Sequence, residues 1–287
     1  MSAAPRLFRF AQFEYPWPLG PPDGRYLLRA PGRSATSDPT HVLVLATLST
    51  RERRSAGRRS RKAQPEPEPS QVSIGRATVI DVGSALGDRA HARQWLARAG
   101  EPELGDALAV LNRALHAFRV VSADPYVHPV GRGQALVARL GFGPGEQVAD
   151  GLWSDARELH QRGRRRSRTK VLEPQARLAA VLGGAQRVLV SEELALRARL
   201  DLEQGREREA ALQVLVALDA ALAEAQADPA APVLASRLSE LRGHREAIAR
   251  AAQSALATPL ARDERETVER ALDLVQATLR ARALASA

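Results

Sequence analysis

The sequence contains no cysteine, and this absence excludes several classes of protein at once. A chain of 287 residues without cysteine forms no disulfide, offers no thiol nucleophile and builds neither a zinc finger nor a cysteine-ligated iron–sulfur cluster. Aromatic residues are also scarce, at 4% of the chain. A core must therefore consist mostly of Ala, Leu and Val. Such a core favours packed helices, because Ala forms helices well and strands poorly.

Long hydrophobic runs are missing as well. No stretch of about 18 apolar residues, close to the length that crosses a bilayer, occurs in the chain. The opening segment, MSAAPRLFRF, has no uninterrupted apolar part of the kind found in secretory signals. We therefore expect a soluble cytoplasmic protein that has no membrane partner.

Acidic residues are outnumbered by basic ones. The chain has 42 Lys and Arg against 33 Asp and Glu, a net charge of +9. From residue 188 onward there are 13 basic and 16 acidic residues, whereas residues 1–187 hold 29 basic and 17 acidic residues. The excess of positive charge thus belongs to the first part of the chain and indicates an acidic partner for that part.

Alternating hydrophobicity near the N-terminus predicts strands. In residues 7–15 (LFRFAQFEY), aromatic residues alternate with residues of other types. Residues 24–30 and 41–48 are two further short apolar runs. Together they predict a small antiparallel β unit over residues 1–50. A fourth strand, 74–82, either completes this sheet or begins a new unit.

In most of the remaining chain, apolar residues recur with the period of an α-helix. From Asp88 to Phe118, leucines three or four residues apart predict helices. Residues 134–153 resemble two strands about a Gly-Pro-Gly turn, which makes residues 71–187 a mixed α/β region with one hairpin. Residues 188–287 carry the apolar stripes of a bundle of about four helices. The helix after Gly205 is apolar around most of its circumference, so we expect the others to surround it.

The predicted fold class is therefore α+β and predominantly helical: a small N-terminal antiparallel β unit, a mixed middle with a hairpin and a C-terminal helical bundle. Residues 51–70, RERRSAGRRSRKAQPEPEPS, separate the first two parts. Their basic run and Pro-Glu alternation favour an exposed linker or a long connection between two strands.

Two basic runs are the strongest functional signal. Guanidinium groups bind phosphates through paired hydrogen bonds, so clustered arginine suits a nucleic-acid-binding segment. Neither run contains an aromatic residue that would stack on a base. The candidate nucleic-acid-binding residues are Arg51, Arg53, Arg54, Arg58, Arg59, Arg61 and Lys62 in the first run, and Arg162, Arg164, Arg165, Arg166, Arg168 and Lys170 in the second.

These features predict a non-enzymatic binding or adaptor protein whose Arg-rich part engages an acidic partner, nucleic acid being the most plausible. Two alternatives stay open. One is a helical scaffold whose C-terminal bundle binds other proteins, the arginine runs being incidental. The other is an enzyme whose site is assembled from scattered residues.

Motifs of catalysis are absent from the sequence. The glycines of residues 139–147 (RLGFGPGEQ) match neither the P-loop nor the dinucleotide fingerprint, and no G-x-S-x-G elbow occurs. Asp88 and His91 lie three residues apart on a predicted helix, but no third metal ligand is near them. We therefore expect no catalytic residue, metal or cofactor. Whether His91, His116 or His128 lines a pocket is left open.

Overall fold

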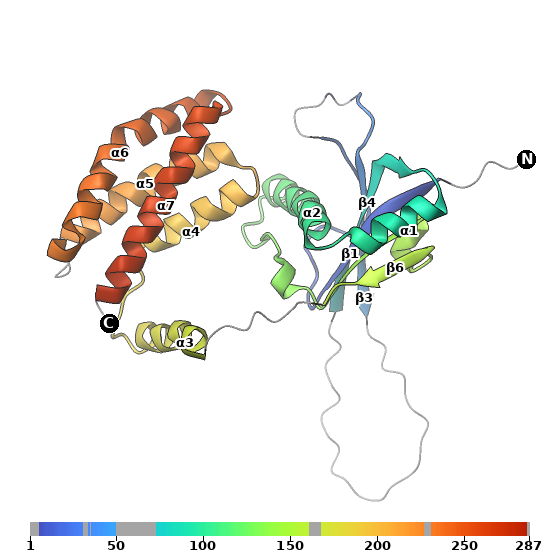
Figure 1. Ribbon diagram of the computed structural model, residues 1–287, viewed down its shortest axis with the longest axis horizontal. Coiled ribbons are helices and arrows are strands. Elements are labelled where there is room, and N and C mark those ends of the chain that lie inside the picture. Colours follow the sequence, from blue (N-terminus) through green and yellow to red (C-terminus); the bar gives the residue numbers. More distant parts are fainter. Residues whose placement is uncertain are drawn as a thin grey trace, which may run out of the picture. The chain divides into compact units, whose positions relative to one another are not determined.

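A computed structural model describes residues 6–30, 34, 36–49, 73–160, 168–226 and 231–285 of the chain. The chain forms two compact units, Met1–Gly163 and Arg164–Ala287. The first unit combines a sheet with helices, and the second is helical throughout its described part (Figure 1).

The first unit is built on one antiparallel sheet. Its strands are β1 (Leu7–Tyr15), β2 (Gly24–Leu28), β3 (His41–Ser49), β4 (Ser73–Leu86), β5 (Val137–Gly143) and β6 (Asp155–Glu158), in the spatial order β2-β3-β4-β1-β5-β6. The predicted strands 7–15, 24–30, 41–48 and 74–82 are all present in this sheet.

Strand β4 completes the N-terminal sheet rather than beginning a new unit. It pairs with β3 on one side and with β1 on the other. The reason lies in its two buried faces, because Ala77 and Val79 face one core cluster while Ile80 belongs to another. A strand buried on both faces belongs in the middle of a sheet. The division of residues 1–50 from 71–187 thus cuts across one hydrogen-bonded sheet.

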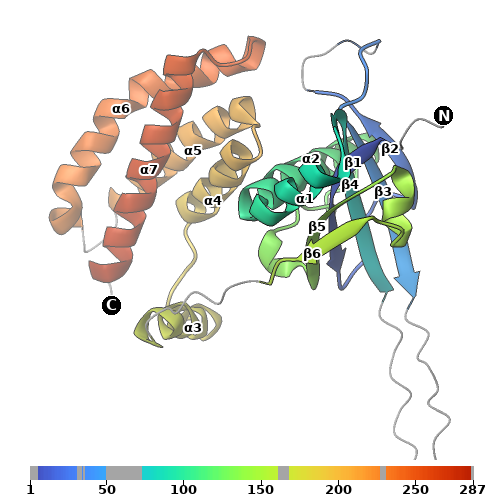
Figure 2. The ribbon, with the colours of Figure 1, turned by 45° about the vertical axis from the view of Figure 1, so that its right-hand side comes forward.

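Two helices cover one face of this sheet (Figure 2). Helix α1 (Arg89–Arg98) begins at Asp88, whose carboxylate accepts a hydrogen bond of 2.8 Å from the backbone N–H of His91. Helix α2 (Glu101–Val121) follows after Gly100, and a short 3₁₀ helix, η1 (Arg132–Gln134), precedes β5. Apolar side chains of α2 pack against the odd-numbered residues of β1, β3 and β4 and the even-numbered residues of β5. The central members of this core are Phe13, Tyr15, Leu43, Leu111, Leu115 and Phe142.

The predicted hairpin of residues 134–153 is present as a pair of strands, but its second strand comes later than expected. Strand β5 pairs antiparallel with β6, and the residues after the Gly-Pro-Gly turn form a short 3₁₀ helix, η2 (Glu146–Asp150), on the other face of the sheet. Long-range packing decides this, since Val148 is buried with Phe10 and Ile80 on this face. The buried amide of Gln12 also donates to the Ala149 carbonyl at 3.3 Å. Local turn chemistry carries no information about either contact.

The second unit contains helices α3 (Arg168–Leu182), α4 (Val190–Glu203), α5 (Glu207–Gln226), α6 (Ala231–Ala257) and α7 (Arg262–Ala285). Helix α5 packs against α4, α6 and α7. The expectation that the other helices surround α5 is wrong for one side, since Leu212 is 36% and Val216 53% exposed. The core of this unit lies on the opposite side of α5, where Val214 and Leu218 are fully buried.

The α+β, predominantly helical fold class is confirmed: 56% of the structure is helical and 20% is strand, and the strands form one antiparallel sheet. Among the described residues, no helix has the length and apolar character needed to cross a membrane.

Candidate functional site

The predicted basic runs fall mainly outside the described residues. This applies to Arg51, Arg53, Arg54, Arg58, Arg59, Arg61 and Lys62 of the first run, and to Arg162, Arg164, Arg165 and Arg166 of the second. Arg168 and Lys170 lie in the first turn of α3, but their side chains are also outside the description. The structure therefore shows only the points of the sheet to which these runs are attached.

Both runs are attached to the same end of the sheet. The chain leaves β3 at Ser49, returns in β4 at the paired residue Ser73, and holds the first run between the two. It leaves the sheet finally at Glu158 of β6, which pairs with Arg139 near the start of β5. Because the strands are antiparallel, these positions share one end of the sheet. β1 and β5 lie between β4 and β6, so the attachment points are separated by three strand spacings, about 15 Å.

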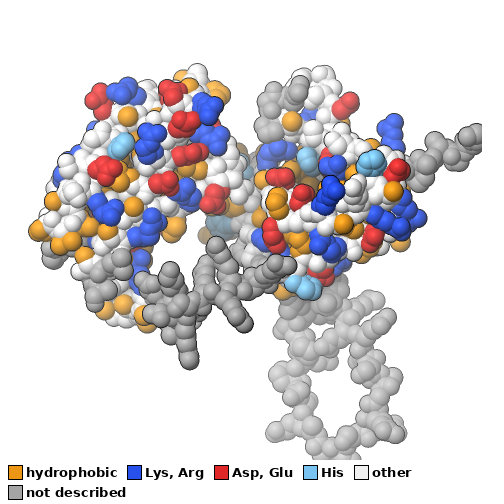
Figure 3. Space-filling view, in the orientation of Figure 1, with side chains coloured by type: hydrophobic (Ala, Val, Ile, Leu, Met, Phe, Trp, Pro, Cys, Tyr) orange, Lys and Arg blue, Asp and Glu red, His pale blue; other side chains and the backbone are white. Residues whose placement is uncertain are grey.

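The described part of the first unit is electrically balanced. Within Met1–Gly163 the described residues include 13 basic and 13 acidic side chains, whereas the whole unit has 22 basic and 16 acidic ones. On the face drawn in Figure 3, both blue and red side chains are spread over the described surface of this unit. The net positive charge of this unit thus comes from outside the described residues, mostly from the first run.

The opposite end of the sheet carries a row of polar residues that sequence reasoning missed. His41 of β3 pairs with Asp81 of β4, and Asp81 pairs in turn with Arg9 of β1. All three have odd numbers, and the odd-numbered residues of these strands face α1 and α2. A His–Asp–Arg row thus crosses three adjacent strands on the helix-covered face.

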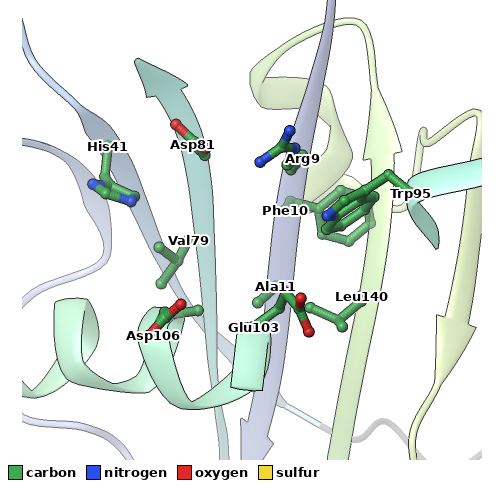
Figure 4. Close-up of a pocket in the computed structure, with 11 residues that line it drawn as sticks. Arg9, Phe10, Ala11, His41, Val79, Asp81, Trp95, Glu103, Asp106 and Leu140 are labelled. Atoms are coloured by element: carbon green, nitrogen blue, oxygen red, sulfur yellow. The ribbon is translucent and has the colours of Figure 1, made fainter. Parts of the chain in front are cut away.

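A cavity of about 170 Å³ lies between this row and the two helices (Figure 4). The apolar part of its lining includes Ala11, Val79 and Leu140 from three neighbouring strands. Helix α1 contributes Trp95, and the first turns of α2 contribute two carboxylates. The charged and polar lining residues are Arg9, His41, Asp81, Trp95, Glu103 and Asp106.

Arg9 is half-buried and forms no ion pair with another described residue. Its guanidinium carbon lies 5.5 Å from the centroid of the Trp95 ring, a cation–π contact that holds the side chain in place. Its Nε is buried without an acceptor, and among the described residues no carboxylate forms an ion pair with it. A buried donor on a charged group without an acceptor costs about 1–3 kcal/mol or more. Among the described residues, the Arg9 guanidinium that lines the cavity thus has no ion-pair partner.

Two of the three carboxylates are held by backbone N–H groups. One oxygen of Asp81 accepts from Gly83 at 3.1 Å and from Ser84 at 3.3 Å. One oxygen of Glu103 accepts from Gly100 at 2.6 Å, which closes the capping box of α2. These bonds orient the carboxylates and leave their second oxygens available to a ligand. Asp106, one turn further along α2, is exposed.

His41 adds polarity to the cavity without adding charge at neutral pH. Burial lowers the pKa of its imidazole, Asp81 opposes this effect, and Arg113 lowers the pKa further. Its Nδ1 lies 3.0 Å from the hydroxyl oxygen of Thr40. The imidazole is therefore a neutral hydrogen-bonding group next to a carboxylate.

The histidines singled out in the sequence do not line this cavity. His91 is exposed on the first turn of α1, with its Nδ1 3.8 Å from Asp88, and His128 is also exposed. His116 lies on α2, half-buried. No group of three or more His, Asp or Glu side chains that could hold a metal occurs within the described part of the chain.

Fold and cavity together define a two-unit α+β protein with a charged ligand-sized cavity at one end of its sheet and basic segments attached at the other. No protein-family model, curated protein or solved structure matches the chain.

Proposed function

We propose that this chain is a non-enzymatic binding or adaptor protein whose arginine-rich segments hold nucleic acid through its phosphates. One observation supports the proposal most directly: the strand topology attaches both basic runs to the same end of one sheet, about 15 Å apart. Two segments joined at that spacing are close enough to contact one duplex, whose major groove is about 12 Å wide.

The charge distribution supports the same function. The described body of the first unit has equal numbers of basic and acidic side chains, so the first run carries most of the charge by which this unit would attract a polyanion. Guanidinium groups bind phosphate oxygens in pairs, and the runs have no aromatic residue to stack on bases. Binding should thus depend weakly on sequence and steeply on salt. The cytoplasmic location expected from the sequence is one in which nucleic acid is present.

The test is a salt series of binding measurements on the full chain. A fluorescent duplex of mixed sequence is titrated with the wild type and with a variant carrying Arg164→Gln, Arg165→Gln, Arg166→Gln and Arg168→Gln. On duplex DNA the logarithm of the binding constant falls by about 0.9 per phosphate neutralised for each tenfold rise in salt. Losing four contacts should make this slope shallower by up to about 3–4 units.

A matched control removes four arginines that lie outside both basic runs, on the first unit. Arg89, Arg93, Arg98 and Arg119 are exposed on α1 and α2, and their change to Gln removes the same charge. This control should alter the slope by less than one unit. Equal slopes for the wild type and the variant in the second run, or no binding at low salt, would contradict the proposal.

The scaffold alternative also has one observation in its favour. Leu196 and Leu200 on α4, and Leu212 and Val216 on α5, are exposed apolar side chains of the second unit. If no duplex or single strand binds at low salt while the chain associates with itself or other proteins by sedimentation, this alternative is preferred.

A further inference from the structure

The cavity at the other end of the sheet holds groups of both charges that do not pair with each other. Arg9 stands on β1, while Asp81 stands on β4 and Glu103 and Asp106 on α2. No ion pair joins Arg9 to these carboxylates among the described residues. Opposite charges that line one small cavity without a direct ion pair between them complement a ligand that carries both charges.

The volume of the cavity and its apolar wall limit the size and the uncharged part of that ligand. A cavity of about 170 Å³ is smaller than the sites of about 300–1,000 Å³ that take drug-sized molecules. Ala11, Val79 and Leu140 give it an apolar wall on the sheet side. The ligand therefore combines a short aliphatic part with its two charged groups.

We propose that this cavity binds a small aliphatic amino acid in its zwitterionic form. The ligand carboxylate takes the free hydrogen-bonding capacity of the Arg9 guanidinium, which Trp95 holds in place. The ammonium group lies toward Glu103 and Asp106 of α2, and the aliphatic side chain contacts the apolar wall. Figure 4 shows Arg9 and Asp81 side by side at one end of this space, with Glu103 and Asp106 at the other.

Other ligand classes fit these groups less well. An inorganic phosphate or another anion would meet three carboxylates and one arginine, which is repulsive on balance. An amine without a carboxylate would leave Arg9 unpaired. A divalent cation lacks a suitable cluster of ligands within the described residues.

The test is calorimetric titration of the full chain at neutral pH with alanine, valine and leucine. Each valine titration is repeated with isobutylamine, which lacks the carboxylate, and with isovalerate, which lacks the amine. At least one amino acid should bind, and each half-molecule should bind at least about tenfold more weakly, because one charged hydrogen-bonding partner is lost.

Two variants assign the binding to this cavity. Arg9→Gln should weaken amino-acid binding by at least about tenfold, and Asp106→Asn by about two- to fivefold, as expected for a solvent-exposed charge pair. Asp150→Asn is the matched control, because Asp150 is exposed and does not line the cavity. If Arg9→Gln fails to fold, the exposed Asp106 still decides the matter.

Three results would overturn the proposal: no binding of any of the three amino acids at millimolar concentration, equal binding of valine and isobutylamine, or unchanged binding by the Asp106→Asn variant. The amino-acid titrations give a result that does not depend on nucleic-acid binding. The variant lacking the four arginines of the second run should retain amino-acid affinity, so failure of one proposal is distinguishable from failure of the other.

Discussion

At the scale of single residues, His41 shows how the sheet changes the chemistry of a side chain. The imidazole is half-buried, faces Asp81 and Arg113, and has a pKa below its ordinary value of 6.5, chiefly because of burial. The unfolded chain therefore binds a proton more readily than the folded one at mildly acidic pH. It follows that His41 stabilises the fold fully above pH 6.5 and loses this contribution as the pH falls toward the lowered pKa.

We predict that His41→Gln makes the stability of the first unit less sensitive to acid below pH 6.5. The free energy of unfolding is measured by urea denaturation at several pH values. Tryptophan fluorescence reports the first unit alone, since Trp17, Trp95 and Trp153 all belong to it. His128→Gln, at an exposed position, should leave the wild-type slope unchanged. A His41→Gln slope equal to that of the wild type would contradict the burial of this group.

At the scale of elements, β5 is held between two close neighbours that leave no room for a side chain at Gly141. A Cβ built there would lie 2.6 Å from the Asp155 carbonyl oxygen of β6 and 2.6 Å from Cζ of Phe10 in β1. Both distances are far below van der Waals contact. The glycine thus permits the close packing of the edge strand and the aromatic ring.

We predict that Gly141→Ala destabilises the first unit by about 1–3 kcal/mol, the usual cost of overpacking. Gly105 on α2 is the matched control, because a Cβ there meets no atom within 4 Å. Gly105→Ala should stabilise the same unit by about 0.5–1 kcal/mol, since alanine restricts the unfolded chain and favours the helix. Thermal and urea unfolding followed by tryptophan fluorescence measure both changes. Equal effects of the two substitutions would show that the packing at Gly141 is looser than described.

At the scale of the whole molecule, the two units differ in how their cores are built. All eleven Phe, Tyr and Trp residues lie before residue 154, so residues 164–287 contain none. The bundle core consists of Ala, Leu, Val and Ile, with Val214, Leu218 and Leu241 fully buried. Its core residues all lie between Ala195 and Val275. The second unit therefore contains a complete core of its own.

We predict that a fragment of residues 164–287 folds alone and melts cooperatively by circular dichroism. In the full chain, Leu218→Asp should unfold this unit, because an unpaired carboxylate would occupy a fully buried position at a cost of several kcal/mol, on the order of 3 or more. The tryptophan-detected midpoint of the first unit should stay the same. A gradual melt of the fragment, or a shift of that midpoint, would show that the units share stability.

Much of this architecture follows from local patterns in the sequence. The alternation in 7–15, the helical period after Asp88 and the apolar stripes beyond residue 188 predict elements that the structure contains. Their physical basis is local, because strand and helix periods determine which side chains share a face. The aromatic residues of β1 also change phase, from Phe8 and Phe10 to Phe13 and Tyr15, and both faces of this strand are buried.

The cavity was determined only by the tertiary structure. Arg9 and Asp81 are 72 positions apart and become neighbours through the register of β1 and β4, which no single segment encodes. The residues after the Gly-Pro-Gly turn likewise become a 3₁₀ helix because Val148 finds a buried place against Phe10 and Ile80. The sequence by itself determined the elements, the imbalance of charge and the basic runs, since these depend on neighbours along the chain. The pairing order of the strands decided which end of the sheet carries the basic runs and which carries the cavity, because burial and backbone hydrogen bonding are satisfied only across the assembled sheet.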